Sequence, residues 1–314
     1  MSAGMRRADG MRIGIDLGGT KIEAILMDGR GEIRRRERLA TPAHDYPATL
    51  ERIRELVRGI EAGQDGPLPV GIGMPGAISR ASGRVKNANS ICLNGQPFRE
   101  DVERLLARPV QLANDADCFT LSEARDGSAA GAGSVFGVII GTGTGAGIVI
   151  DGKLLQGPNA IAGEWGHNPL PWPGPVDAPA PPCYCGLSGC IETYLSGPGF
   201  SRDYRQASGE SLSAEGIVAL ARAGEGVAGE ALERYLQRLS RALASVINIL
   251  DPEVIVIGGG MANIDAIYTR VPRLWGAYVF SDRVDTRLCR PCFGDSSGVR
   301  GAAWLCDGQG AAEL

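Results

Sequence analysis

Four side chains that commonly bind metals lie close together in the middle of the sequence. His167 is followed, after the proline-rich segment 168–182, by a C-x-C-x4-C pattern formed by Cys183, Cys185 and Cys190. Three thiolates and one imidazole are the ligand set of a closed, tetrahedral structural zinc site. The spacing therefore predicts a structural Zn²⁺ held by these four residues. Unligated cysteines that pack as small apolar residues, or disulfides in an oxidising compartment, are the alternatives.

Two glutamates flank this predicted zinc site, Glu164 before His167 and Glu192 after Cys190. Carboxylates accept hydrogen bonds from hydroxyl groups, so the pair suits a neutral polyol. The metal is then expected to shape a polar ligand pocket rather than to perform chemistry itself. Glutamates most often lie on the solvated surface, which is the alternative for both.

Three glycine-rich turns each follow a short apolar run. Glycine lets the backbone approach phosphate oxygens, and free N–H groups then bind the anion. Threonine and lysine side chains add donors, and Asp16 is suited to hold Mg²⁺ directly or through water. A single turn of this kind is more often a simple hairpin, but three together favour a nucleotide bound between two domains. The residues predicted to bind it are Asp16, Gly18, Gly19, Thr20, Lys21, Thr142, Gly143, Gly258, Gly259 and Gly260.

The elements that must position these residues alternate between strands and helices. Apolar runs and alternating patterns predict strands over 11–16, 21–27, 70–74, 110–113, 135–140, 148–150 and 254–257. Helical spacing of apolar residues predicts helices over 47–62, 98–107, 117–130, 213–223, 228–250, 261–275 and 299–305. Each half of the chain opens with a strand, a glycine–threonine turn, a second strand and an Asp-Gly turn. An α/β fold with a duplicated sheet core is therefore expected.

Size and composition limit the classes of protein to which the chain can belong. At 314 residues it is longer than one hydrophobic core usually supports, so two domains are expected. A net charge of −4 argues against a nucleic-acid-binding surface. No apolar run reaches the ~18 residues of a membrane span, and residues 1–10 lack the apolar segment of a signal peptide. We therefore expect a soluble, cytoplasmic protein without nucleic-acid or membrane partners.

Six segments carry a family resemblance, and they are 16–21, 112–116, 140–143, 163–167, 183–192 and 257–260. Together they resemble the motifs of the ROK sugar kinases, over about residues 11–306. These kinases belong to the actin-like, hexokinase-like ATPase superfamily, whose sheets have the ribonuclease H-like design. Segments 87–90 and 167–172 most resemble the bacterial fructokinase (manno-fructokinase) branch.

The resemblance implies transfer of the γ-phosphoryl group of ATP to the 6-hydroxyl of a hexose, with Mg²⁺ as the catalytic metal. Asp115 is the implied general base, and Asn114 is the implied ligand of the neighbouring sugar hydroxyl. The alternative for Asp115 is a helix N-cap, a role that we expect Asp117 to fill instead. The sugar-binding residues that the resemblance implies are Gly76, Asn89, Asn114, Asp115, Glu164, His167 and Glu192.

D-Fructose, giving fructose 6-phosphate, is the expected reaction, and N-acetylglucosamine, mannose and glucose are the alternative substrates within the family. A sugar-responsive repressor of the same family is the alternative of a different class. It is disfavoured because the few residues before the first strand leave no room for a helix-turn-helix. A non-catalytic actin-like scaffold is disfavoured because it would need no Asn-Asp pair.

The expected organisation has three parts. Residues 1–10 are expected to form a disordered extension. Residues 11–115, together with a C-terminal helix at about 298–308, are expected to form a smaller α/β domain. Residues 116–297 are expected to form a larger α/β domain that holds the zinc site. The resemblance also implies a homodimer.

Overall fold

The computed structural model describes residues 10–42 and 44–307. It contains two five-stranded sheets of the same design, with strand orders β3-β2-β1-β4-β7 and β10-β9-β8-β11-β12. In each sheet the first three strands along the chain form an antiparallel meander. A fourth strand then pairs in parallel with the first one, and a fifth pairs in parallel with the fourth. The predicted α/β fold with a duplicated sheet core is confirmed.

The first sheet consists of β1 (Arg12–Leu17), β2 (Lys21–Met27), β3 (Ile33–Ala40), β4 (Val70–Met74) and β7 (Val110–Asn114). The second sheet consists of β8 (Ser134–Ile140), β9 (Thr144–Ile150), β10 (Lys153–Leu154), β11 (Val254–Gly258) and β12 (Arg287–Cys289). A small separate hairpin is formed by β5 (Ala77–Ile78) and β6 (Val85–Lys86).

The α-helices are α1 (Tyr46–Glu61), α2 (Phe98–Leu106), α3 (Asp115–Arg125), α4 (Ile191–Leu195), α5 (Gly197–Ser208), α6 (Ala214–Arg222), α7 (Gly226–Leu250), α8 (Asp265–Leu274) and α9 (Ser297–Trp304). Short 3-10 helices are η1 (Ile91–Leu93), η2 (Trp165–His167), η3 (Pro175–Asp177), η4 (Gly260–Asn263), η5 (Trp275–Ala277), η6 (Gly294–Ser296) and η7 (Leu305–Asp307).

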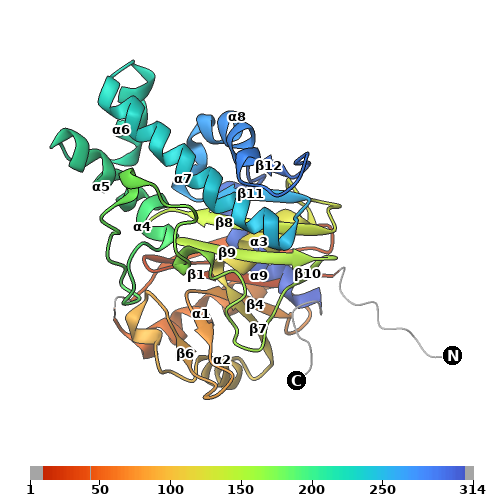
Figure 1. Ribbon diagram of the computed structural model, residues 1–314. Coiled ribbons are helices and arrows are strands. Elements are labelled where there is room, and N and C mark those ends of the chain that lie inside the picture. Colours follow the sequence, from red (N-terminus) through yellow and green to blue (C-terminus); the bar gives the residue numbers. More distant parts are fainter. Residues whose placement is uncertain (1–9, 43, 308–314) are drawn as a thin grey trace.

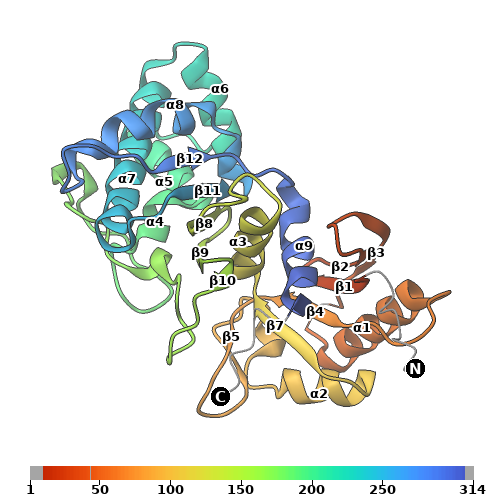
Figure 2. The ribbon, with the colours of Figure 1, turned by 90° about the vertical axis from the view of Figure 1, so that its right-hand side faces the viewer.

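Helices α3 and α9 lie side by side between the two sheets (Figure 1, Figure 2). Two glycines make this arrangement possible. A Cβ atom on Gly301 of α9 would lie 1.7 Å from the carbonyl oxygen of Cys118 in α3. A Cβ atom on Gly71 of β4 would lie 1.9 Å from the carbonyl oxygen of Ala302. Helix α9, the last α-helix among the described residues, therefore packs on both α3 and the first sheet, and it joins the two halves.

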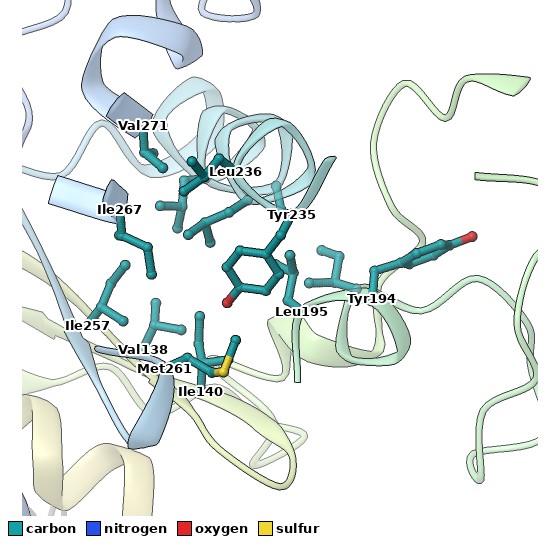
Figure 3. Packing of buried hydrophobic residues seen from close by; sticks show 14 of the residues in the cluster. Val138, Ile140, Tyr194, Leu195, Tyr235, Leu236, Ile257, Met261, Ile267 and Val271 are labelled. Carbon is teal, nitrogen blue, oxygen red and sulfur yellow. The ribbon is translucent and has the colours of Figure 1, made fainter. Parts of the chain in front are cut away.

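Each half has its own hydrophobic core. In the second half, α4, α7 and α8 pack against β8 and β11. Figure 3 shows the fully buried Tyr235 of α7 among side chains from these elements, which include Val138, Leu195, Ile257 and Ile267. Burying one apolar side chain such as Leu195 or Ile257 contributes about 1.5–3 kcal/mol. This packing fixes the second sheet and α4, which both carry residues of the site described below.

Most predicted helices and strands are confirmed, but several limits were wrong. The helix predicted over 117–130 begins at Asp115 and ends at Arg125. The strand predicted over 148–150 begins earlier, at Thr144, because residues with small side chains continue the pairing with β8. The helix predicted over 261–275 is divided into η4 and α8. Helices α4 and α5 were missed because glycine, serine and proline at 196–199 interrupt the apolar spacing.

The domain limits expected at 11–115 and 116–297 stay predictions. Residues 1–9 of the expected extension, and residue 308 of the expected C-terminal helix, lie outside the described residues. Within the part of the chain that the structure describes, no helix combines the length and the apolar character needed to cross a bilayer.

Candidate active site

A cavity of about 320 Å³ lies between the two halves of the molecule. The ends of β4 and β7, the turn between β8 and β9, and the segments around η2 and α4 contribute to its wall. All of the residues predicted to bind a sugar line it, namely Gly76, Asn89, Asn114, Asp115, Glu164, His167 and Glu192. The structure therefore brings together side chains that are spread over more than a third of the sequence. We refer to this space as the sugar cavity.

Asn114 and Asp115 lie where β7 ends and α3 begins. Asn114 is the N-cap of α3, because its Oδ1 accepts a hydrogen bond from the N–H of Ala116 at 2.9 Å. Its Nδ2 donates to the carbonyl oxygen of Gly76 at 3.0 Å, which fixes the orientation of the amide. The expectation that Asp117 caps this helix was wrong. Asp115 stands in the first turn of the helix and is open to the cavity.

Three aspartates crowd together around this helix start. The surrounding protein shields Asp115 from bulk water and raises its pKa, and the charge of Glu164 adds to the effect. Burial and then the charge of Asp115 raise the pKa of Asp117 to about 7. The same two causes raise the pKa of Asp16, at the end of β1, to about 6. A divalent cation beside Asp16 would relieve this repulsion, so the Asp16 carboxylate fits Mg²⁺.

The predicted zinc ligands converge on one point. The ligand atoms of His167, Cys183, Cys185 and Cys190 all lie within 4.8 Å of one another. The Sγ atoms of Cys185 and Cys190 are 3.6 Å apart, and two thiolates on a tetrahedral zinc stand about 3.8 Å apart. All eight cysteines fall within the described residues and are free of disulfides. The cluster therefore fits a structural Zn²⁺.

The imidazole of His167 faces two ways. Its Nδ1 is 3.6 Å from the Sγ of Cys183, on the side of the cysteine cluster. Its Nε2 is 2.9 Å from the hydroxyl of Tyr184, which lines the sugar cavity. A metal bound at Nδ1 would fix the direction of Nε2. The ring can therefore contact a ligand in the cavity while it is anchored from behind.

The proline-rich segment 168–182 is anchored on α7 rather than folded over the site. Asp177 is buried, and its carboxylate forms ion pairs with Arg238 at 2.8 Å and Arg241 at 2.9 Å. At the start of the segment, the carbonyl oxygen of Asn168 accepts a hydrogen bond from the N–H of Ile191 at 2.8 Å. These bonds bring His167 to the cysteine cluster whatever the length of the loop between them.

The predicted nucleotide-binding residues are only partly brought together. Thr142 and Gly143 line the sugar cavity, whereas 16–21 and 258–260 do not. Gly259 packs against the end of β8, since a Cβ atom there would lie 2.4 Å from the carbonyl oxygen of Ile140. The segment 258–260 therefore lies beside the turn that contains Thr142, outside the cavity.

Lys21 has a partner that the sequence pattern did not indicate. Its ammonium is 3.7 Å from Glu23, which also binds Arg36 and Arg38. Lys21 and Glu23 are two positions apart in β2, so they lie on the same face of the sheet. The predicted binding of phosphate by Lys21 therefore competes with this ion pair.

Tyr184 is a residue of the site that was missed. It lies between two of the zinc-site cysteines, lines the sugar cavity and contacts His167 with its ring at 5.1 Å between centroids. Its position between Cys183 and Cys185 could have indicated this role, because a metal site that fixes both cysteines also fixes the residue between them. Asn87 and Thr144 line the same cavity, and they fall in segment 87–90 and in the glycine-rich turn after β8, but neither was singled out as a site residue.

Comparison with known proteins places the chain among sugar kinases. A family model described as the ROK family matches residues 12–309. An N-acetyl-D-glucosamine kinase of Yersinia pseudotuberculosis serotype O:3 (strain YPIII) is 39% identical, with 94% of this chain and 98% of that protein covered. An N-acetyl-D-glucosamine kinase of Vibrio cholerae serotype O1 is 40% identical, with 94% and 99% covered.

Solved structures agree with the sequence relatives. The ROK hexokinase from Thermus thermophilus has a TM-score of 0.83 at 30% identity, with 94% of this chain and 97% of that chain covered. A ROK family glucokinase from Streptomyces griseus, solved in complex with glucose and AMPPNP, has a TM-score of 0.75 at 28% identity, with 94% and 99% covered. These matches confirm the predicted actin-like, hexokinase-like fold. Because the family model and the relatives cover nearly the whole chain, this protein belongs to the ROK family.

Proposed function

We propose that this protein is an ATP-dependent hexose kinase that phosphorylates N-acetylglucosamine at its 6-hydroxyl. The observation that carries the proposal is the convergence of every predicted sugar-binding residue on one cavity, with Asp115 open to it. The relatives at 39% and 40% identity are both named N-acetyl-D-glucosamine kinases, so they favour this sugar over the fructose expected from the sequence. N-Acetylglucosamine was among the expected alternatives.

Asp115 serves as the general base in this proposal. It accepts the proton of the 6-hydroxyl, whose oxygen then forms a bond to the γ-phosphorus while the bond to the β-phosphate oxygen breaks. A raised pKa brings this carboxylate closer to neutral pH, which favours proton transfer as long as the group is ionised. Asn114 holds the adjacent hydroxyl, because its amide is fixed by Gly76 and by the start of α3.

The remaining groups bind and orient the substrates. Mg²⁺, when bound, neutralises the charge on the transferred phosphoryl group. Asp16 is the residue that would hold it, directly or through water. Zn²⁺ would fix His167 and the start of α4, and it would take no part in phosphoryl transfer. The homodimer and the cytoplasmic location expected from the sequence remain part of the proposal.

An assay of ADP release across hexoses tests the proposed substrate. Purified protein is incubated with ATP, Mg²⁺ and N-acetylglucosamine, N-acetylmannosamine, glucose, mannose or fructose in turn. We expect the highest kcat/KM with N-acetylglucosamine, at least about tenfold above fructose, a ratio that corresponds to about 1.4 kcal/mol. A preference for fructose would restore the expectation from the sequence. If none of the sugars in the panel gives ADP release, hexose phosphorylation is refuted altogether.

A further inference from the structure

Three cations surround one buried carboxylate on the first sheet. Glu23 of β2 is 2% exposed, and it forms ion pairs with Lys21, Arg36 and Arg38. Nε of Arg38 donates a hydrogen bond to Oε2 at 2.8 Å. The guanidinium of Arg36 lies 2.9 Å from Oε1, as an ion pair without the alignment of a hydrogen bond. The ammonium of Lys21 is 3.7 Å from Oε2, beyond hydrogen-bond distance, so Lys21 is the most weakly held of the three cations.

Lys21 lies on the same face of the sheet as the carboxylate that fits Mg²⁺. Asp16 is paired with Glu23 across β1 and β2, and Lys21 is two positions before Glu23, so all three side chains share one face. Burial is the main cause of the raised pKa of Asp16, and the charge of Lys21 opposes it, so this ammonium is near the Asp16 carboxylate. The start of α9 covers the same face, since a Cβ atom on Gly298 would lie 3.7 Å from the Asp16 carboxylate (Figure 2).

The glycine turn before Lys21 reaches the wall of the sugar cavity. A Cβ atom on Gly19 would lie 3.9 Å from the hydroxyl of Ser90, the neighbour of Asn89, which lines that cavity. A phosphate chain bound to Mg²⁺ at Asp16 and directed at the sugar would therefore lie close to Lys21. A lysine ammonium in this position suits phosphate oxygens, provided that Glu23 does not hold it.

We propose that Arg38, assisted by Arg36, is a positioning residue for the nucleotide: it neutralises Glu23, so that Lys21 is free to bind the phosphate chain of ATP. A guanidinium remains ionised at any physiological pH, so Glu23 is neutralised at all times. Lys21 loses only a long, half-exposed ion pair when it turns to the phosphates. The inference rests on the proposed use of ATP.

The two arginines are held in place for this role. Nη2 of Arg36 donates to the hydroxyl of Ser296 at 3.1 Å, which ties β3 to the start of α9. The hydrogen bond to Glu23 is the first cause of the raised pKa of Arg38, and the charge of Asp295 is a minor one. Glu23 is therefore the main partner of Arg38. Direct binding of phosphate by Arg38 is the competing explanation, and the experiment below separates the two.

Nucleotide binding without a sugar tests the inference apart from the choice of substrate. Titration calorimetry with Mg²⁺ and AMPPNP, an ATP analogue that resists hydrolysis, gives the Kd of the wild-type protein, Lys21→Ala, Arg38→Ala and the double variant. Both side chains are about half exposed, so these variants should fold. The KM values for ATP and for the sugar are measured in parallel.

We expect Lys21→Ala to raise the Kd of AMPPNP about tenfold, as for the loss of one hydrogen bond between charged groups. Arg38→Ala leaves Oε2 of Glu23 to Lys21, so the Kd should rise about five- to tenfold. In the Lys21→Ala background, Arg38→Ala should change the Kd by less than about twofold, because no lysine remains to be captured. The KM for ATP should follow the Kd, and the KM for the sugar should change by less than about twofold.

A second substitution should reverse the effect of the first. Adding Glu23→Gln to Arg38→Ala removes the charge that captures Lys21 and should restore the Kd to within about twofold of the wild-type value. Arg35→Ala is the matched control. Arg35 is in the same strand and pairs with Glu37, but it lies opposite Leu26, on the face of the sheet that α1 covers. It should leave the Kd unchanged.

The possible failures can be told apart. If the wild-type protein binds no AMPPNP and phosphorylates no sugar, the proposed function is wrong and the inference falls with it. If AMPPNP binds with the expected pattern but no hexose is phosphorylated, only the proposed substrate is wrong. If the effects of Lys21→Ala and Arg38→Ala multiply in the double variant, Arg38 binds the nucleotide itself and the positioning role is refuted. An unchanged Kd in Lys21→Ala would also overturn the inference.

Discussion

The backbone N–H of Thr144 donates a hydrogen bond to Glu192 Oε2 at 2.8 Å. Thr144 is the first residue of β9, directly after the glycine turn, and Glu192 is in the first turn of α4, directly after the cysteine cluster. The bond thus ties the turn expected to contact the nucleotide to the segment that the zinc site orders. It also uses one carboxylate oxygen of Glu192 and leaves the other available to a ligand in the sugar cavity.

A side chain at Gly143 would have to displace the carboxylate of Glu192. A Cβ atom there would lie 2.8 Å from Glu192 Oε2, closer than real Cβ contacts allow. We therefore expect Gly143→Ala to displace Glu192 and to raise the KM for the sugar about tenfold, which is the cost of about one hydrogen bond to a charged group. Steady-state kinetics with a varied sugar concentration measures this effect.

Gly141→Ala is the comparison for that experiment. It adds a methyl group at the other end of the same turn, where no atom lies within 4 Å of the new Cβ. It should therefore raise the KM less than Gly143→Ala does. Equal losses in the two variants would show that the turn needs glycine for another reason, such as the approach of a phosphate.

Replacement of Asp115 should reduce catalysis without abolishing sugar binding. In Asp115→Ala the base is lost while the sugar keeps its other ligands, so kcat should fall by about 10²–10⁴-fold. Calorimetric titration with the sugar should still show binding, weakened by less than about tenfold. Asp65→Ala, at an exposed position outside the sugar cavity, is the control for purification and folding. Near-normal turnover in Asp115→Ala would remove this residue from the mechanism.

The convergence of the cysteines could be predicted because soft ligands at short spacing carry their meaning locally. The roles expected of Asn114 and Asp115 came from the family resemblance, because a polar pair after a strand does not by itself distinguish a base from a helix cap. The bond between Thr144 and Glu192 could not be predicted, because it joins residues that meet only after both halves of the chain have folded. The same holds for α9, whose packing on α3 depends on the backbone approach at Gly301.

Lys21 shows a different limit of sequence reasoning. Its place after a glycine turn is typical of a lysine that binds phosphate. The pattern does not show which charged side chains lie on the same face of the strand. The cavity of about 530 Å³ that adjoins the sugar cavity illustrates the same limit on a larger scale. Its walls combine α2, the β5–β6 hairpin and the loop 155–164, which lie far apart in the sequence, so no local pattern indicated a pocket beside Glu164.

The metal content of the purified protein tests the cysteine cluster. We expect one zinc per chain by elemental mass spectrometry, and we expect Cys185→Ser to lose it because a tetrahedral site with three ligands binds far more weakly. Removal of the metal should also lower the melting temperature of the wild-type protein, since metal binding contributes to folding. Cys292→Ser, which changes an exposed cysteine outside the cluster, should retain the metal. A folded wild-type protein without zinc would contradict the assignment.

The titration of Asp16 makes the stability of the fold depend on pH. The direction of this dependence is opposite to that of an ion-paired carboxylate. Its pKa is about 6 in the folded protein against an ordinary 3.8, so the folded state holds this proton more tightly than the unfolded state does. The stabilising effect of the proton is complete below the pKa that Asp16 has in the unfolded state. It is lost as the pH rises from about 4 to about 6, and at higher pH the buried negative charge weakens the fold.

Asp16→Asn should therefore stabilise the protein at pH 8 and have little effect near pH 4. The shift of roughly two pKa units corresponds to about 2–3 kcal/mol, which would raise the melting temperature by about 4–8 °C. The wild-type protein should regain stability when Mg²⁺ and ATP are added, whereas the variant should gain less and should lose phosphoryl transfer. Asp282→Asn, on an exposed loop, is the matched control. A melting temperature that rises equally at pH 4 and pH 8 would mean that charge is not the cause, because only the ionised form of Asp16 destabilises the fold.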